Sequence, residues 1–509
     1  MRHLFLALAL LATLLVKGQS KVQVPAKDEK PTQVELLNSD YLQVDERLGK
    51  DVKRLVGNVA FKHDDVLLYC DSAYLYTLTN SLDAFSQVHI IQGDSVNMYG
   101  DKLKYDGNKK NAVMTGNVVL IEKNNTVTTD KLIYDVKGGI ATYNTGGKIV
   151  SRQNNNVLTS KVGYYYSKTK QFYFRNKVEL VNPKYTMNSD TLRYNTVNET
   201  SYFFGPTTIV SKENFIYCEN GWYDTRRDLA QFNRNAYIIS GKQRLSGDSL
   251  YYNRKAGLGR GFGHVVLADT AQNIVIKGDK GFYEEAREKM IVFGNAEMAQ
   301  LFDTDTLFLH ADTLRSEFDS CHEYRQLFAH YKVKFFKADM QGKCDSLVFS
   351  YADSILKMFH KPVLWTDENQ LTANYITITT TKGKIKQLDM YDVAFVISEE
   401  DTLFYNQIKG KKIVGLFADN KLRKINVFGN GQTIYYPKDD DAYTGVNRAD
   451  CTDMVIYTKE NKVERITFIT KPVATLYPMN ELPPKELLLK DFNWRIKERP
   501  LKREDIFVP

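Results

Sequence analysis

The chain has 509 residues, of which 43% are hydrophobic, so it is long enough to bury a sizeable core. Its formal charge of +8 is modest for this length, and its lysines and arginines are spread along the chain, which argues against a dedicated nucleic-acid-binding face. Proline is scarce, with 12 residues, whereas 32 tyrosines and 27 phenylalanines favour β-strands.

The N-terminus has the layout of a secretory signal peptide. A short basic start is followed by an apolar run over residues 4–16, which is too short for a membrane span, and by Gly18 just before an expected cut near Gln19. We therefore predict a cleaved signal peptide at residues 1–19 and a flexible segment at 20–33. No later stretch is apolar enough to span a bilayer, so the mature chain is expected to be exported without a membrane helix.

The rest of the chain is organised by one repeated motif. Its clearest copy is Gly100-Asp101-Lys102-Leu103-Lys104-Tyr105, with an acid near the start of an alternating strand. The positions equivalent to Asp101 are 71, 101, 130, 160, 190, 219, 248, 279, 312 and 345, in steps of 29 to 33 residues. So regular a period predicts a repeat architecture in which each unit packs on its neighbours.

A second motif alternates with the first, as in Gly57-Asn58 and Gly116-Asn117. We expect these pairs to form tight turns between strands, because both residue types tolerate positive φ. The glycine-rich stretch at 257–263 is likewise predicted to be a flexible turn. Between the turns the sequence alternates with period two, which predicts strands with one apolar face. Stacked units would join these faces into one continuous apolar surface.

The array is predicted to run over residues 34–300 with regular repeats and over 301–478 with longer, more divergent ones. Residues 479–509 differ in composition, with Pro483-Pro484, a leucine run, Phe492 and Trp494. This tail is expected to form a C-terminal cap or a docking segment, since repeat arrays need terminal caps.

Motifs for catalysis or metal binding do not stand out. The histidines lack the paired spacing of zinc sites, and each repeated aspartate is expected to accept a hydrogen bond from turn backbone rather than bind calcium. Cys70, Cys218 and Cys344 share one repeat position, where we interpret them as small apolar residues. We predict no cofactor, no metal and no enzymatic activity.

The signal peptide, the Gly-Asn pairs and the Asp-x-Leu-x-Tyr strands together resemble the OstA-like family, which includes LptA and the N-terminal domain of LptD. The closing Phe492-Asn493-Trp494-Arg495 is similar to tails of OstA-like proteins from Bacteroidetes-type bacteria. The chain is far longer than LptA, and it lacks the long C-terminal run of barrel strands of LptD.

The resemblance implies an all-β, β-jellyroll or β-solenoid-like repeat fold whose apolar trough holds the acyl chains of lipopolysaccharide or a related glycolipid. The implied location is the periplasm, with outer-membrane association as a further option. The implied partners are LptC-like and LptD-like proteins, or further copies of this chain, joined end to end by strand addition, and no nucleic acid. The expected lipid-facing residues are Val59, Phe61, Leu103, Tyr105, Val118, Leu120, Leu132, Tyr134, Val178, Leu180, Leu192, Tyr194, Leu250 and Tyr252.

Two alternatives remain open from the sequence. The first is a structural or adhesive β-solenoid whose interior is filled by its own side chains, and the second is a carbohydrate-active β-helix enzyme. An open apolar groove distinguishes the lipid-binding protein from the first alternative, and a cleft with clustered acids and bases would favour the second.

Overall fold

The computed structural model describes residues 32–44, 47, 49–93, 96–152, 155–212, 214–318, 325–381, 384–401, 403–419, 421–439, 442–459 and 462–508. The predicted signal peptide and Cys321 lie outside these residues. The chain divides into two compact units, of which unit 1 takes Met1–Leu120 and Ile133–Gly138 and unit 2 takes Ile121–Leu132 and Gly139–Pro509. No helix among the described residues is long and apolar enough to cross a membrane.

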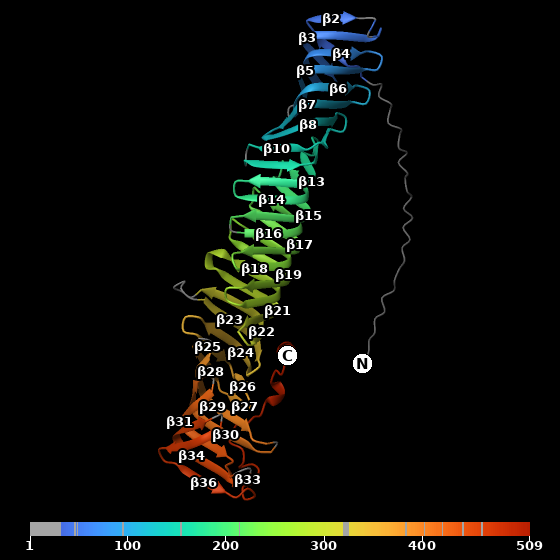
Figure 1. Ribbon diagram of the computed structural model, residues 1–509. Helices are drawn as coiled ribbons and strands as arrows, with labels where there is room; N and C mark the ends of the chain where they lie inside the picture. Colours follow the sequence, from blue (N-terminus) through green and yellow to red (C-terminus); the bar gives the residue numbers. More distant parts are fainter. Residues whose placement is uncertain are drawn as a thin grey trace, which may run out of the picture. The chain divides into compact units, whose positions relative to one another are not determined.

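The fold is an all-β repeat architecture, which confirms the predicted fold class (Figure 1). Among the described residues, 34 strands belong to the main antiparallel sheet, and β32 and β33 form a separate pair. The strands are β1 Glu35–Asn38, β2 Tyr41–Val44, β3 Val52–His63, β4 Val66–Tyr76, β5 Ser81–Gln92, β6 Val96–Asp106, β7 Asn111–Glu122, β8 Asn125–Asp135, β9 Ile140–Tyr143, β10 Gly147–Ser151, β11 Asn156–Ser160, β12 Val162–Tyr166, β13 Gln171–Asn182, β14 Tyr185–Asn195, β15 Thr200–Ser211, β16 Asn214–Asp224, β17 Leu229–Ser240, β18 Gln243–Asn253, β19 Leu258–Asp269, β20 Ile274–Glu284, β21 Lys289–Leu301, β22 Thr306–Phe318, β23 Arg325–Lys337, β24 Met340–Ser350, β25 Ile355–Phe359, β26 Val363–Thr366, β27 Asn369–Thr372, β28 Tyr375–Thr381, β29 Lys384–Glu399, β30 Tyr405–Ala418, β31 Lys421–Tyr435, β32 Lys438–Asp439, β33 Ala442–Tyr443, β34 Val446–Lys459, β35 Lys462–Ile469 and β36 Val473–Tyr477. Three short 3-10 helices are η1 Glu285–Arg287, η2 Ile496–Glu498 and η3 Arg503–Phe507.

The Gly-Asn pairs do not form the turns that the sequence suggested, and this prediction is wrong. Gly294 and Asn295 lie in the middle of β21, where these two residues face the single residue Asp312 of β22. Both have positive φ, of 75° and 49°, so the pair is a β-bulge that bends the strand. The hairpin turns lie elsewhere, for example between Asp106 and Asn111.

The repeated acid has a side-chain partner at these bulges. Asn295 Nδ2 donates to Asp279 on the neighbouring strand at 3.1 Å, and Asn117 donates to Asp101 at 2.9 Å in unit 1. A Cβ atom on Gly294 would lie 2.7 Å from Asp279 Oδ2, so the carboxylate occupies the space that the glycine leaves free. The repeated acid and the bulge therefore form one structural device, and in these two copies the acid accepts from an asparagine side chain of the bulge, where the sequence had suggested turn backbone.

The bulges divide the sheet of unit 2 into two layers. Layer 1 contains residues such as 289–293 of β21 and 313–318 of β22, and layer 2 contains 296–301 and 306–311 of the same strands. Val292 of layer 1 and Met298 of layer 2 are both buried in one hydrophobic cluster, so the two layers share a core. The strands have 11 or 12 residues in β13–β20, whereas after residue 300 their lengths vary, from 4 residues in β26 and β27 to 16 in β29.

The role of the bulge can be tested with two glycines of unit 2. We expect Gly294→Ala to lower the free energy of unfolding by about 1 kcal/mol more than Gly241→Ala. Both positions have positive φ and share the cost of a left-handed alanine, of about 1–2 kcal/mol. Only a Cβ at Gly294 meets a carboxylate, since nothing lies within 4 Å of one at Gly241. Urea unfolding followed by tryptophan fluorescence measures the difference, and equal losses would contradict this role for the acid.

Candidate functional site

The fourteen residues expected to line a trough are placed by the structure on the inward faces of the sheet. Twelve of them are buried, whereas Tyr194 and Tyr252 are half-buried. Seven belong to unit 1, namely Val59, Phe61, Leu103, Tyr105, Val118, Leu120 and Tyr134. The other seven belong to unit 2. Whether lipid reaches them stays a prediction.

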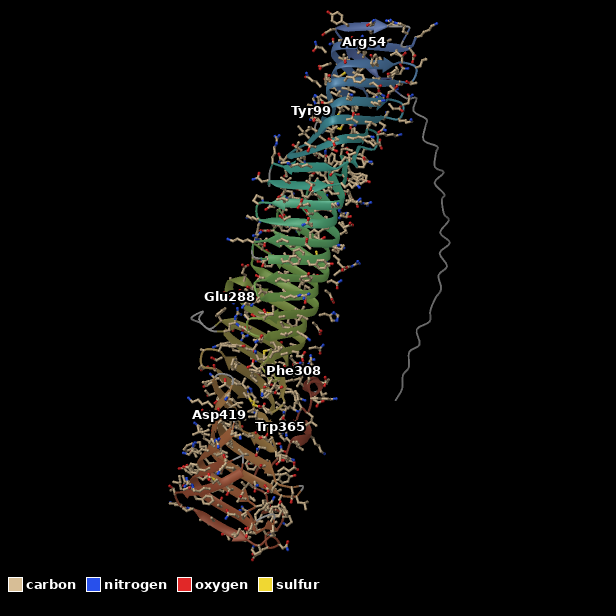
Figure 2. All side chains as sticks on the ribbon, viewed as in Figure 1. Arg54, Tyr99, Glu288, Phe308, Trp365 and Asp419 are labelled. Carbon is tan, nitrogen blue, oxygen red and sulfur yellow. The ribbon has the colours of Figure 1, made fainter. Side chains whose placement is uncertain are left out.

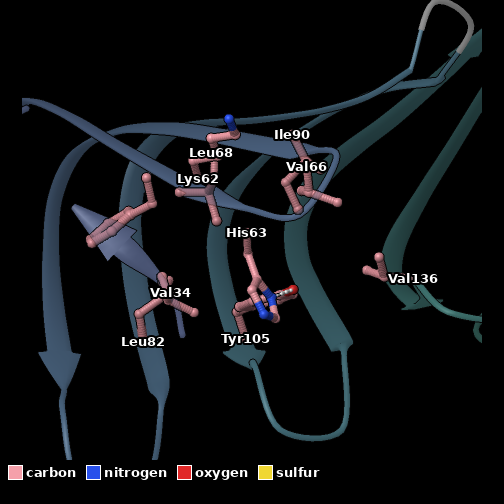
Figure 3. Close-up of a pocket in the computed structure, with 10 residues that line it drawn as sticks. Val34, Lys62, His63, Val66, Leu68, Leu82, Ile90, Tyr105 and Val136 are labelled. Carbon is pink, nitrogen blue, oxygen red and sulfur yellow. Dashed lines mark hydrogen bonds between the residues drawn. The ribbon is translucent and has the colours of Figure 1, made fainter. Parts of the chain in front are cut away.

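The interior of unit 1 is closed at its mouth. Below Val34 lies a cavity of about 10 Å³, lined by apolar side chains that include Phe61 and Tyr105 (Figure 3). Such a volume holds about one water molecule, so it has no room for an acyl chain. The N-terminal segment seals this mouth, since the Val34 amide donates to Asn80 Oδ1 at 2.8 Å and Asn80 Nδ2 donates to the Thr32 carbonyl at 2.9 Å.

Buried His63 fixes the same segment from below. Its Nδ1 lies 2.6 Å from the Tyr105 hydroxyl, and its Nε2 lies 3.0 Å from the Thr32 carbonyl oxygen. Because a carbonyl can only accept, Nε2 carries the proton and Nδ1 accepts from Tyr105. The Thr32 hydroxyl in turn donates to Asp64 at 2.8 Å, and Lys110 pairs with the same carboxylate. Thr32 of the sealing segment is thus held by His63 and Asp64, which Tyr105 and Lys110 position in turn, and the sequence had not suggested this arrangement.

Layer 2 of unit 2 carries a continuous row of inward-facing apolar residues, which we call the inner row. Direct cross-strand pairing joins each member to the next from β14 to β23. The inner row consists of Met187, Ile209, Ile216, Ile238, Leu245, Leu267, Ile276, Met298, Leu309 and Phe335.

Burial changes along the inner row. Five consecutive members, Ile209 to Leu267, are half-buried, although they face inward. On the C-terminal side the row becomes dry, with Leu309 exposed by 2% and Phe335 by 1%, and Met187 at its other end is also buried. A partly exposed aliphatic row about five strands wide, at roughly 4.8 Å per strand, therefore lies between two closed regions.

Glycines in layer 1 contribute to this opening. Gly259 and Gly261 lie within β19, and Gly281 lies within β20, so the prediction of a flexible turn at 257–263 is wrong for most of this stretch. Gly261 pairs with inward-facing Leu250 and with Gly281, so two successive strands place no side chain in the interior there. The positive φ values of Gly257 and Gly263 mark the turn and the bulge at either end.

Tyrosines form a rim along the edge of layer 1. Tyr194, Tyr223, Tyr252 and Tyr283 recur on alternate strands, with Ser201, Ala230 and Gly259 between them. The Tyr252 hydroxyl donates to Glu285 at 2.7 Å, and burial together with this carboxylate raises the pKa of Tyr252 to about 12. The Tyr223 hydroxyl donates to Asp228 at 2.6 Å. A tyrosine has an apolar ring and a polar hydroxyl, so it suits the boundary between an apolar interior and water.

The described cysteines, the acidic and histidine side chains and an outer hollow give no sign of a reactive or metal-binding site. Cys70, Cys218 and Cys344 are buried beside the bulges, and burial raises the pKa of each thiol to about 12. In the part of the chain that the structure describes, no three His, Cys, Asp or Glu side chains are placed to hold a metal ion. A shallow hollow of about 530 Å³ on the outer side near β13–β15 is lined largely by polar residues such as Lys177 and Asn188.

Residues 31–190 and 188–248 match the family model of OstA-like proteins. No curated protein sequence matches the chain. Among solved structures, a similar chain is LptH, described as the LptA homologous periplasmic component of the conserved lipopolysaccharide transport device from Pseudomonas aeruginosa. The identity is 15% over 27% of this chain and 82% of LptH, with a TM-score of 0.14.

The difference in burial along the inner row predicts different costs for the same substitution. We expect Leu309→Ala to lower the free energy of unfolding by about 2–5 kcal/mol, because it leaves a cavity in a dry core. Leu245→Ala should cost about 1 kcal/mol, because its side chain is only half-buried and its removal leaves a smaller dry cavity. Urea unfolding followed by tryptophan fluorescence measures both losses. A loss at Leu245 as large as that at Leu309 would show that the interior is closed along its whole length.

Proposed function

Because residues 31–248 are OstA-like, we propose that this chain is a periplasmic lipopolysaccharide transport or assembly protein whose interior carries lipid acyl chains between the inner and outer membranes. The half-buried part of the inner row, bordered by the tyrosine rim, is the observation that supports this most directly. Export would use the segment predicted at residues 1–19. The proposal assigns the chain no catalytic role.

The physical argument concerns acyl chains in water. Each methylene exposed to water costs about 0.8 kcal/mol, so an acyl chain of about twelve carbons loses roughly 10 kcal/mol on leaving an apolar environment. A row of equivalent aliphatic side chains lowers this barrier. Because its members are alike and follow one another at strand spacing, a lipid can shift from one strand to the next without a deep energy minimum. The tyrosine hydroxyls would face the sugars, which stay in water.

The lining that we propose starts at the half-buried segment of unit 2. There Leu192, Tyr194, Leu250 and Tyr252 of layer 1 face the inner row, and Leu132, Val178 and Leu180 extend the apolar surface toward the N-terminal side. The corresponding residues of unit 1 would receive lipid only after the segment around Thr32 moves aside, since that segment seals their interior.

The outermost strands suggest how the chain joins its partners. Among the described residues, β1 and β2 pair only with β3, and β35 and β36 pair only with β34. Their side chains include well-exposed apolar residues such as Tyr41 at 75% and Val473 at 69%. Unpaired strand edges of this kind accept a strand from another protein. We propose LptC-like and LptD-like proteins, or a second copy of this chain, as the source of that strand.

One observation favours a second candidate function. The interior is densely packed in unit 1 and again from β21 onward, as expected for a structural β-array with a filled core. In this alternative the half-buried row would be a local defect of packing rather than a lipid path.

A matched pair of positions on β17 separates the two candidates. We expect a photoreactive residue in place of Ile238, which faces inward, to form an adduct with lipopolysaccharide in cells. The same residue in place of Ile239 should not, because that side chain lies on the outer face and is 37% exposed. Adducts are read by immunoblotting for lipopolysaccharide. Equal labelling at both positions, or labelling at neither, would contradict a lipid-carrying interior and favour the filled array.

A further inference from the structure

Residues 479–508, which we call the strap, fold back across unit 2 in the direction opposite to the strand order (Figure 1). Their contacts begin at Arg448 of β34, whose guanidinium donates to the Glu486 carbonyl at 2.9 Å. They end at Lys334 of β23, which donates to the Val508 carbonyl at 2.5 Å. A single segment without strands, which includes η2 and η3, thus ties together strands that are far apart along the sheet.

The strap lies on the outer face of layer 2, opposite the inner row. Cross-strand pairs there form an outer row, and Figure 2 labels its members Phe308 and Trp365 on the side along which the strap runs. The outer row consists of Phe308, Phe336, Gln341, Trp365, Gln370, Ile397, Gln407 and Ile434. The strap therefore covers the back of the layer whose front forms the apolar interior.

Buried glutamines of the outer row bind the backbone of the strap. Gln370 Nε2 donates to the Asn493 carbonyl at 2.7 Å, and its Oε1 accepts from the Arg495 amide at 2.6 Å. Gln407 repeats this arrangement with the Leu487 carbonyl and the Leu489 amide, at 2.9 and 2.8 Å. Each side-chain amide thus takes the place of a peptide group in a strand pair. If the strap were absent, the side-chain amides of Gln370 and Gln407 would have to bond to water instead. The outer row is therefore shaped to bind the backbone of the strap.

Charged pairs fix the two halves of the strap. Arg503 makes two bonds to buried Glu297 of β21, at 2.5 and 2.6 Å, and stacks on the ring of Phe308. Glu498 accepts from Lys343 at 2.9 Å and also pairs with Arg495; these cations lower the pKa of Glu498 to about 2. In the first half of the strap, Lys409 of β30 donates to Asp491 at 2.8 Å.

Apolar side chains complete the contact at the C-terminal end of the sheet. Leu489 of the strap is buried in a cluster with Phe395, Ile397 and Ile434, and Phe492 and Trp494 pack against the same cluster. Toward residue 508 the strap is held by charged and polar contacts, with Arg503 41% exposed on its side chain, and by buried Ile506 beside the Phe507 ring that packs on His310. The distal half has fewer apolar contacts than the half around Leu489, Phe492 and Trp494, so we expect it to detach first.

The free end of the strap lies next to a change in the interior. The inner row is half-buried up to Leu267 on β19 and becomes buried at Ile276 on β20, one strand before the strands on which residues 503–508 lie. It stays dry on those strands, with Met298 on β21 and Phe335 on β23 buried. We propose that the strap is a gate, which holds layer 2 against layer 1 from β21 onward and whose release opens the interior there to acyl chains. This inference rests on the proposed lipid-carrying function.

The test uses the full-length purified protein with a photoreactive residue at Phe335 or at Ile238, and purified lipopolysaccharide as the probe. Arg503→Glu places a like charge against Glu297 and should release the distal strap. Arg503→Glu combined with Glu297→Arg should restore the pair and is the matched control. Trypsin cleavage after Lys497 and Lys502 reports release directly, because a docked strap resists proteolysis. Gln341→Leu with Ile506→Ser removes the acceptor of the Arg499 guanidinium, at 2.7 Å, and the buried apolar contact of the distal strap, so it provides a second route to release that leaves every charge in place.

We expect an adduct at Ile238 in all variants, and at Phe335 a rise of about tenfold on release, which the control reverses. An unchanged Phe335 adduct after proven release, or a strong Phe335 adduct in the unaltered protein, would overturn the gate while leaving the proposed function intact. Failure of both routes to expose the trypsin sites would also overturn it, since the strap would not be displaceable. No adduct at Ile238 in any variant would instead overturn the proposed function and the gate with it.

Discussion

The bend in the middle of each long strand is the constraint on which the rest of this structure depends. A flat sheet with one apolar face would leave that face in water. Two residues with positive φ, such as Gly294 and Asn295, bend each strand so that the two layers of the sheet face each other and share one interior. The aspartate on the neighbouring strand fixes the bend, because it holds the asparagine amide and fills the space above the glycine. Repetition of this device about every thirty residues keeps the bends in line, so within unit 2 the interior continues from one strand to the next.

The same construction gives either a dry core or an accessible row, depending on what lies against the inward face. In unit 1 the segment at Thr32 and Val34 seals the mouth. In β15–β19 no such segment covers the described residues of the inner row, and glycines replace inward side chains on layer 1. An apolar surface that remains half in water costs free energy unless a ligand covers it. This is why the half-buried row, rather than the buried lining, supports the proposed lipid path.

The strap shows how a polar tail can influence an apolar interior that it does not touch. Its backbone is bound by buried glutamines, and its charges meet buried or half-buried partners such as Glu297 and Lys343. Such contacts are favourable only when all members are satisfied, so the tail docks as an ordered segment over many strands. Because it braces one layer from outside, its state bears on how closely that layer packs against the other.

The sequence by itself determined the repeat, the all-β class and the inward face of each strand, because period and alternation are local properties of the chain. It placed Leu103 and Tyr105 on one face correctly, and it interpreted the buried cysteines as small apolar residues. It did not distinguish a bulge from a turn at Gly57-Asn58 or within 257–263, because that depends on which residue lies across the strand pair. Only the tertiary structure decided where the interior is open and where the tail docks. Gln370 and Gln407 meet backbone groups 80 to 125 residues away, and nothing in their local sequence marks them as partners of that tail.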